Sequence, residues 1–315
     1  MPRVETVLGP VDVRDFGEML SHEHVVVSEG HESLYYPWRY DFAKTHDVAI
    51  RRLTDAKHGG VGGLIDLTTP DLARDVAAVR EISRASGVHV VAATGIWRNI
   101  PRTFWDRDPD ETAGMFVHEI EVGIADTGIK AGAIKVANDR EGVTKEAEPV
   151  LRAAARALKR TGTPISTHSY SPGRVGLEQV AVFKSEGAPM DRIAIGHSDD
   201  TTDVAYLLEI LDAGCYLSMD RFDPADWPGY PSWRERAATV AALVERGWAH
   251  RVMLGHDFPP DYIPAGAEPV PSPNPYLFVH DTVLPELRRL GVADEEIDAM
   301  TRLTPAEFLT GERLA

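Results

Sequence analysis

The feature that most constrains the fold of this 315-residue chain is an alternation of short apolar runs with longer amphipathic segments. The segments between the runs, such as 148–162 and 204–214, carry apolar residues at helical spacing and end in glycine, as a helix C-cap does. Strand-like runs that alternate with helices are typical of a parallel sheet built from βα units. The eight short runs lie at residues 19–24, 63–69, 88–95, 132–137, 164–169, 193–198, 215–220 and 251–257.

Eight such units predict an α/β fold of one particular kind, a single (β/α)8 TIM barrel. No proline- or serine-rich linker divides the chain, so residues 1–315 are predicted to form one domain. In this fold the carboxyl ends of all strands open on one face, and active sites are built there. The residues at the strand ends therefore carry the functional information.

Composition excludes several classes of function. The chain has 49 acidic and 33 basic residues, a net charge of -16, which argues against binding to nucleic acid or to an anionic membrane. Its one cysteine, Cys215, rules out an intramolecular disulfide framework, and its apolar surroundings predict a buried, unreactive thiol. No stretch approaches the ~18 apolar residues of a membrane span, and the N-terminus lacks the apolar core of a signal peptide. We therefore expect a cytoplasmic protein.

Side chains that bind metals recur where the predicted strands end. A single histidine in a strand is more commonly a packed core residue than a ligand. Four histidines and an aspartate that reach one rim instead favour a metal site. Their positions are His22 and His24 on strand one, His168 on strand five, His197 on strand six and Asp257 on strand eight, with Lys135 on strand four.

The ligand types narrow the choice of metal. His22 and His24 are spaced i, i+2, so on a strand both imidazoles project from the same face. Imidazole and carboxylate suit Zn, Mn, Co or Fe, and the absence of nearby thiolates argues against a structural zinc knot. Lys135 is the one member of this set that is not a usual metal ligand. Burial beside cations favours the neutral amine of a lysine over the charged ammonium.

At these residues the chain resembles the phosphotriesterase branch of the amidohydrolase superfamily, and especially its lactonase-like members. The resemblance covers essentially the whole length, from "VLGPVDVRDFGEMLSHEHV" through "AATGIW", "AGAIKVA" and "TPISTHS" to "RIAIGHSDD" and "RVMLGHDF". It implies two divalent metal ions in the barrel mouth, with zinc expected and cobalt, manganese or iron as alternatives. The implied ligands are His22, His24 and Asp257 for the more buried ion and His168 and His197 for the more exposed one, with carboxylated Lys135 and a hydroxide bridging the two.

The implied chemistry makes Lys135 and Asp257 the catalytic residues. A neutral lysine amine adds carbon dioxide to form a carbamate, which supplies negative charge and one oxygen for each metal. A hydroxide between two metals is a strong nucleophile near neutral pH. It would attack a lactone carbonyl carbon, and Asp257 would pass a proton to the departing alkoxide.

Substrate contacts are expected from the loops after the strands. The resemblance places Trp97, after strand three, and Arg221, after strand seven, beside the substrate. Arg221 could instead form a rim ion pair with Asp220 or Asp223, and Trp97 could serve as packing. The proline-rich segment 256–278 is expected to cover the mouth of the site.

The function expected from the sequence is hydrolysis of a small-molecule lactone, such as an acyl-homoserine lactone, with promiscuous turnover of organophosphates. Such an enzyme would be quorum-quenching, and relatives suggest a homodimer. A primary phosphotriesterase or carboxylesterase on the same metals stays open, because each reaction develops negative charge on an oxygen. A metal-bearing barrel that binds a ligand without catalysis is a further alternative. A barrel glycosidase needs two carboxyl groups across the mouth, whereas strand four offers Lys135.

Overall fold

Eight parallel strands form the centre of the structure, a computed structural model that describes residues 2–28, 32–225 and 227–314. They pair in the order β10-β9-β8-β7-β6-β5-β4-β3, which is the reverse of their order in the chain. Two hydrogen bonds of 3.0 Å, from Ser21 Oγ to the Leu254 carbonyl and from the Asp257 amide to the His22 carbonyl, join the last strand to the first. The strands are β3 (Glu18–Glu23), β4 (Val61–Asp66), β5 (His89–Ile96), β6 (Ala133–Ala137), β7 (Ile165–His168), β8 (Ile193–Ile195), β9 (Tyr216–Met219) and β10 (Val252–Leu254). The predicted (β/α)8 barrel is confirmed.

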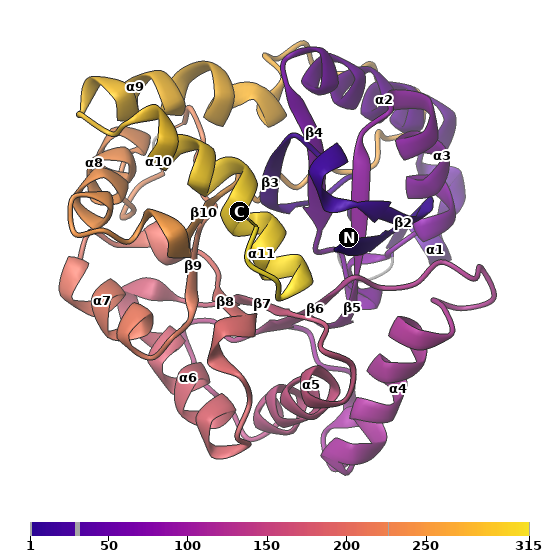
Figure 1. Ribbon diagram of the computed structural model, residues 1–315. Helices are drawn as coiled ribbons and strands as arrows, with labels where there is room; N and C mark the ends of the chain where they lie inside the picture. The colour runs from indigo at the N-terminus through magenta and orange to yellow at the C-terminus, as the bar shows by residue number, and fades with distance from the viewer. Residues whose placement is uncertain (1, 29–31, 226, 315) are drawn as a thin grey trace.

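Helices surround this barrel (Figure 1). Helix α5 shows why they form: its apolar residues, including Leu151 and Leu158, are buried along one face, and Gly162 ends it at a φ of 76°. The helices between strands are α1 (Glu32–Tyr35), α2 (Phe42–His58), α3 (Val76–Ser86), α4 (Pro109–Glu121), α5 (Glu148–Thr161), α6 (Val175–Ser185), α7 (Val204–Asp212) and α8 (Trp233–Val244). After β10 come α9 (Leu284–Arg289), α10 (Asp294–Asp298) and α11 (Thr304–Thr310), with π-helical turns at Val279–Val283 and Ala299–Leu303.

The two ends of the described chain cover the amino end of the barrel (Figure 1). An antiparallel hairpin of β1 (Arg3–Thr6) and β2 (Gly9–Asp12), which the sequence patterns did not predict, lies against β5, where the Val7 amide donates to the Val90 carbonyl. Helix α11 lies beside it, and Phe308 packs edge-on against Tyr216 of β9. The carboxyl end of the barrel is therefore the open end.

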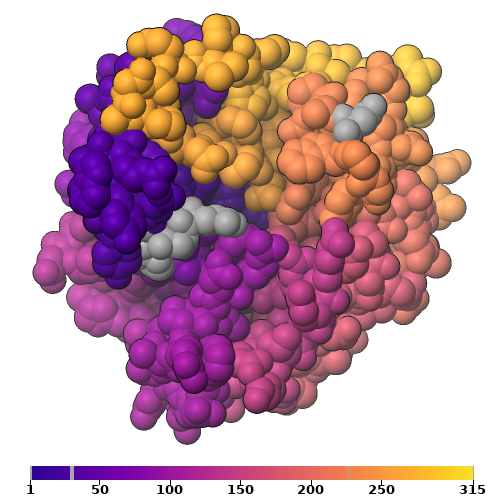
Figure 2. Space-filling view, turned by 180° about the vertical axis from the view of Figure 1, so that it is seen from behind, coloured from indigo at the N-terminus to yellow at the C-terminus, as the bar shows by residue number. Residues whose placement is uncertain are grey.

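The segment after β10 borders that open end. Isolated bridges pair Val27 with Asp261 and Tyr40 with Pro264, so the proline-rich segment 256–278 lies alongside residues 27–40. Figure 2 shows this face hollowed between the amber residues of that segment and the orange residues that follow β9.

Two expectations about the rest of the molecule can be compared with the structure. Cys215 is fully buried, and burial raises the pKa of its thiol to about 12, which makes it unreactive. Among the described helices, none is long and apolar enough to cross a membrane.

Candidate metal centre

The six predicted metal ligands meet at the carboxyl rim of the barrel. His22 and His168 lie at the ends of β3 and β7, and Lys135 lies in the middle of β6. His24 directly follows β3, whereas His197 is the second residue after β8 and Asp257 is the third residue after β10. The two histidines His22 and His197, like Lys135, are at most 1% exposed, so the cluster is closed to bulk water at its base.

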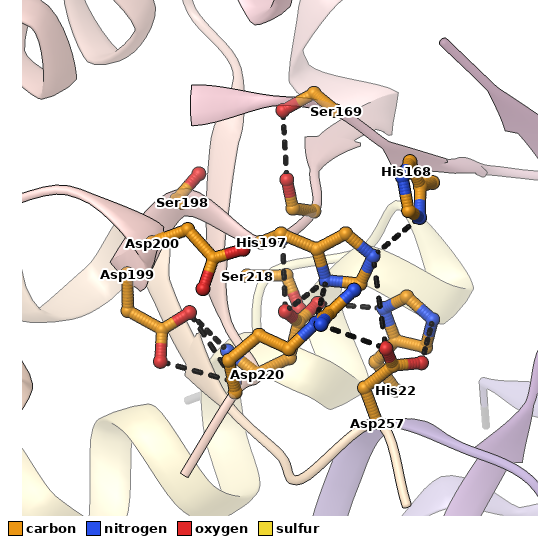
Figure 3. Close-up of polar contacts among 12 residues, drawn as sticks. His22, His168, Ser169, His197, Ser198, Asp199, Asp200, Ser218, Asp220 and Asp257 are labelled. Atoms are coloured by element: carbon orange, nitrogen blue, oxygen red, sulfur yellow. Dashed lines mark hydrogen bonds and ion pairs between the residues drawn. The ribbon is translucent and has the colours of Figure 1, made fainter. Parts of the chain in front are cut away.

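One group of donors forms around the carboxylate of Asp257. Its Oδ1 lies 3.1 Å from His22 Nε2 and 3.2 Å from His24 Nε2. The backbone of Asp257 is in the left-handed region, with a φ of 49°, and its carboxylate points toward His22 (Figure 3).

A second pair of donors lies beside the first. His168 Nδ1 and His197 Nε2 are 2.7 Å apart, and their rings meet edge to face with centroids 4.3 Å apart. The structure thus places His168 beside His197, and His22 and His24 beside Asp257.

Lys135 reaches the cluster from inside the barrel. Its Nζ lies 2.9 Å from His22 Nε2 and 3.3 Å from the Thr167 carbonyl. The neighbouring strand can approach closely because residue 95 is glycine: a Cβ there would lie 1.9 Å from the Lys135 carbonyl oxygen.

Asp220, at the end of β9, holds two of the histidines, a role that the sequence analysis missed. Its Oδ2 lies 2.6 Å from His22 Nδ1, and its Oδ1 lies 2.8 Å from His197 Nδ1 (Figure 3). The signal was present, because the predicted strand 215–220 ends in an aspartate. Since Asp220 occupies the outer nitrogen of each ring, it orients these histidines from behind instead of sharing a metal with them.

His24 is oriented in the same way by a neutral partner. Its Nδ1 lies 2.8 Å from Thr68 Oγ1, and the threonine hydroxyl in turn donates to Asp66 at the end of β4. Neither Thr68 nor Asp66 was predicted from the sequence. Because the Nδ1 atoms of His22, His24 and His197 are engaged in hydrogen bonds with Asp220 or Thr68, the lone pairs are on the Nε2 atoms. These Nε2 atoms face one another and Asp257. Converging acceptors of this type fit a divalent cation such as zinc.

The protonation of the cluster agrees with this fit. Burial lowers the pKa of His168 to about 4 and that of Lys135 to about 8, although nearby carboxylates oppose the second shift. Burial alone would raise the pKa of Asp257, but Arg221 and the histidines hold it well below its usual range. For His22, burial disfavours the charged form, yet Asp220 and Asp257 raise the pKa. The carboxylates around His22 therefore favour a positive charge at this place, which a bound cation would supply while His22 stays neutral.

The predicted substrate residues lie beside this cluster. Arg221 Nε lies 3.0 Å from Asp257 Oδ2, so its ion pair is with the candidate ligand and not with Asp220 or Asp223. Trp97 meets the His168 ring edge to face at 5.9 Å, and its amide donates to a buried carboxylate oxygen of Asp71. Trp97 and Arg221 both line the cavity above the cluster.

Comparison with known proteins matches residues 2–309 to the model of the phosphotriesterase family. The chain belongs to the phosphotriesterase family. A "Phosphotriesterase homology protein" of Mycobacterium tuberculosis is 40% identical over 95% of each chain, and an "Aryldialkylphosphatase" of Saccharolobus solfataricus is 33% identical over 95% of this chain and 97% of that one. The solved "Structure of the phosphotriesterase from Mycobacterium tuberculosis" superposes with a TM-score of 0.89 over 98% of each chain, at 39% identity. An "N-acetyltaurine hydrolase" of Tetraodon nigroviridis is 26% identical over 98% of each chain.

These relatives make the protein a metal-dependent hydrolase of ester or amide bonds. Enzymes of the phosphotriesterase family use two metal ions, and the described residues include a group, formed by His22, His24 and Asp257, that could hold a metal ion. A non-catalytic barrel and a glycosidase are thereby set aside.

As in other enzymes with buried reaction centres, a cavity leads from the cluster to the surface. Its volume is about 790 Å³. One wall is apolar and is formed by Val27, Phe258, Tyr262 and Pro264, which come from the two segments that border the open end, and by Leu72, which lies in the loop after β4. The floor is formed by His24, His168, Arg221 and Asp257.

Asp220→Asn is expected to weaken metal binding at both positions. An asparagine has one acceptor oxygen and one amide donor, so it cannot accept from both Nδ1 atoms, and loss of such a partner typically costs about 10- to 100-fold in metal affinity. Metal content after dialysis against a competing chelator measures the effect. Thr68→Val, which removes the partner of His24 alone, should weaken one position only. If Asp220→Asn retained both metals as well as the wild-type enzyme does, the assignment would be contradicted.

Proposed function

We propose that this phosphotriesterase-family enzyme is a lactonase that acts on neutral lactones with an apolar side chain, such as acyl-homoserine lactones. Turnover of neutral organophosphate triesters is proposed as a weaker side activity. The metal ligands are proposed as above: His22, His24 and Asp257 for one ion, His168 and His197 for the other, and Lys135 between them. Zinc is the proposed metal.

The observation that carries the proposal is the charge of the cavity. Among the described residues that line it, the permanently charged cations are Arg221 and Arg236. Arg221 Nε pairs with Asp257 at 3.0 Å, and Arg236 Nη1 pairs with Asp200 at 2.8 Å. Both positive charges are thus matched by carboxylates, of which Asp200 is buried and Asp257 is partly buried, so the cavity offers no surplus cation to an anionic substrate.

The apolar wall favours a substrate with a hydrocarbon arm. A lactone ring placed over the cluster would leave its acyl chain room beside Phe258 and Tyr262, where burial of each CH₂ contributes about 0.8 kcal/mol. A compact triester would leave much of the 790 Å³ unfilled.

The residues of the chain would then act as follows. When bound, the two metal ions would lower the pKa of a water molecule and polarise the ester carbonyl. The water oxygen attacks the carbonyl carbon, the ring C–O bond breaks, and Asp257 carries the proton from the water to the departing alkoxide. Arg221 holds the second oxygen of Asp257 in place for this transfer, and Trp97 limits the access of solvent from the side of His168.

Lys135 is proposed to be carboxylated. Its pKa of about 8, lowered by burial, leaves the neutral amine accessible near neutral pH. The amine nitrogen adds to carbon dioxide and loses a proton, and the product is a carbamate anion with two oxygens. This anion would compensate the charge of two cations held by neutral histidines.

The competing substrate is a carboxamide that carries a sulfonate group, by analogy with the N-acetyltaurine hydrolases. A sulfonate carries a permanent negative charge, and it would enter a cavity also lined by Glu32, Asp223 and Asp261. This arrangement disfavours N-acetyltaurine as the substrate of this enzyme.

A panel of substrates tests the proposal. We expect kcat/KM to be highest for lactones with long acyl chains, lower for a neutral triester, and at least about 100-fold lower for N-acetyltaurine, because an unpaired buried charge costs several kcal/mol. Steady-state hydrolysis with the zinc-loaded enzyme gives the ranking. A higher kcat/KM for the triester than for every lactone would assign the enzyme as a phosphotriesterase.

The proposal extends to a homodimer in the cytoplasm. The exposed side chains of Leu34, Tyr35 and Trp38, which are 57%, 71% and 71% exposed, support a surface that pairs with another copy. Light scattering of the purified protein measures its mass in solution.

A further inference from the structure

Glu23 occupies the position between the two histidines of the first donor group, and its side chain is fully buried. Because successive residues on a strand point to opposite faces, Glu23 points away from the cluster that His22 and His24 face. Nothing assigned so far to the metal centre requires a carboxylate there. Its contacts show what it holds.

Each oxygen of Glu23 accepts hydrogen bonds from the segment that carries Asp257. Oε1 accepts from the His256 amide at 2.8 Å and from His256 Nδ1 at 2.6 Å. Oε2 accepts from the Phe258 amide at 3.4 Å. The amide of Asp257 itself, between them, donates to the His22 carbonyl at 3.0 Å. Three consecutive amides therefore bond to residues 22 and 23.

The tautomer of His256 follows from its second contact. The Val279 amide donates to His256 Nε2 at 3.0 Å, so Nε2 carries the lone pair and Nδ1 carries the proton that goes to Glu23. The imidazole thereby links Glu23 to the start of the π-helical turn Val279–Val283. We call Glu23, the amides of His256 and Phe258, and the His256 ring the Glu23 clamp.

The clamp encloses a residue whose backbone is strained. Asp257 has a φ of 49°, and non-glycine residues persist there only when their surroundings hold them. The amides on either side of Asp257 both bond to Glu23, which is the arrangement of a backbone nest around an anion. We propose that Glu23 is a positioning residue that holds Asp257 in this conformation and so sets the place of its carboxylate among the donors. The inference rests on the proposed role of Asp257.

Glu23→Gln tests the clamp with little change in volume. Glutamine has one acceptor oxygen and places an amide N–H₂ against backbone donors, so one side of the segment is released. We expect kcat to fall about 10- to 100-fold with KM within about 3-fold, because a displacement of about 1 Å of a reacting group costs that much. We also expect the visible absorption spectrum of the cobalt-substituted protein to change, since Asp257 is displaced as a ligand.

Glu18→Gln is the matched control. Glu18 lies on the same strand and bonds to His280 Nδ1 at 2.8 Å, so it ties β3 to the same π-helical turn, but at the far end from the cluster. Its variant should keep kcat within about 2-fold and leave the cobalt spectrum unchanged. Equal losses in the two variants, or an unchanged spectrum or kcat in Glu23→Gln, would overturn the proposal.

Two variants of His256 keep the test decisive if Glu23→Gln does not fold. Asparagine can still donate to Glu23 from the place of Nδ1, whereas glutamine can accept from Val279 at the place of Nε2 but loses the donor to Glu23. We expect His256→Gln to lose more kcat and to change the cobalt spectrum more than His256→Asn. Equal effects or the reverse order would overturn the clamp.

The outcomes separate this inference from the proposed function. The cobalt spectrum reports the position of Asp257 without any substrate, so it tests the clamp even if lactones are not turned over. If Asp257→Asn retained full activity, the proton-transfer role would fail while the spectrum of Glu23→Gln still decided the positioning.

Discussion

Lys135→Met is expected to abolish both metal retention and hydrolysis. Methionine fills the volume of the buried side chain but offers no amine for a carbamate, so the two ions lose the anion proposed between them. We expect kcat/KM to fall by at least about 10³-fold. Bound metal ions stabilise the transition state by several kcal/mol, and each ~1.4 kcal/mol of that stabilisation that is lost lowers the rate about tenfold. Elemental analysis of the purified protein and steady-state kinetics measure the two effects.

Lys135→Glu separates charge from other roles of the lysine. A glutamate supplies a carboxylate at this position without carbon dioxide, so it should retain more metal and more activity than methionine. Lys130→Met, in the loop before β6, is the control for loss of a lysine and should behave as the wild-type enzyme does. Protein equilibrated with ¹³C-labelled bicarbonate should show a carbamate resonance that Lys135→Met lacks. A fully metal-loaded enzyme without this resonance would refute carboxylation.

Asp257→Asn is expected to stop turnover while metal remains bound. Asparagine keeps an oxygen near His22 Nε2 and His24 Nε2, but an amide cannot accept the proton of the attacking water. We expect kcat to fall on the order of 10³-fold, since positioned proton transfer contributes about 10²- to 10⁴-fold. Kinetics on samples with a measured metal content close to two per chain provide the test.

Asp66→Asn is the matched control for this substitution. Asp66 is also a buried carboxylate at the rim, but it contacts His24 only through Thr68 and touches no reacting atom. Its variant should bind metal about 10-fold more weakly and yet reach nearly the full kcat once saturated with zinc. If Asp257→Asn reached a similar kcat, Asp257 could not be the group that transfers the proton.

Much of the site could be predicted because it depends on strand ends. His168, His197 and Asp257 lie far apart in the sequence, but each follows an apolar run, and parallel strands bring their carboxyl ends to one rim. The structure brings all six predicted ligands together there. Trp97 and Arg221 could be placed near the cavity by the same reasoning.

The contacts behind the ligands could not be predicted in this way. Asp220 was visible at a strand end, yet nothing in its neighbours in sequence shows that it lies within 2.8 Å of both His22 and His197. The partner of Arg221 could not be predicted either. Its neighbours in sequence, Asp220 and Asp223, were the candidate ion-pair partners, whereas the structure pairs it with Asp257, 36 residues later.

By itself, the sequence determined the barrel, the rim on which the site lies and the side chains that can bind metal, because hydrophobic periodicity and strand direction are local properties that the chain order preserves. Only the tertiary structure decided which nitrogen of each histidine faces inward and that carboxylates neutralise the arginines of the cavity. It also decided that Glu23 accepts hydrogen bonds from the residues on either side of Asp257. Those depend on hydrogen bonds and ion pairs between residues up to 235 positions apart, whose distances and directions exist only after the barrel has closed.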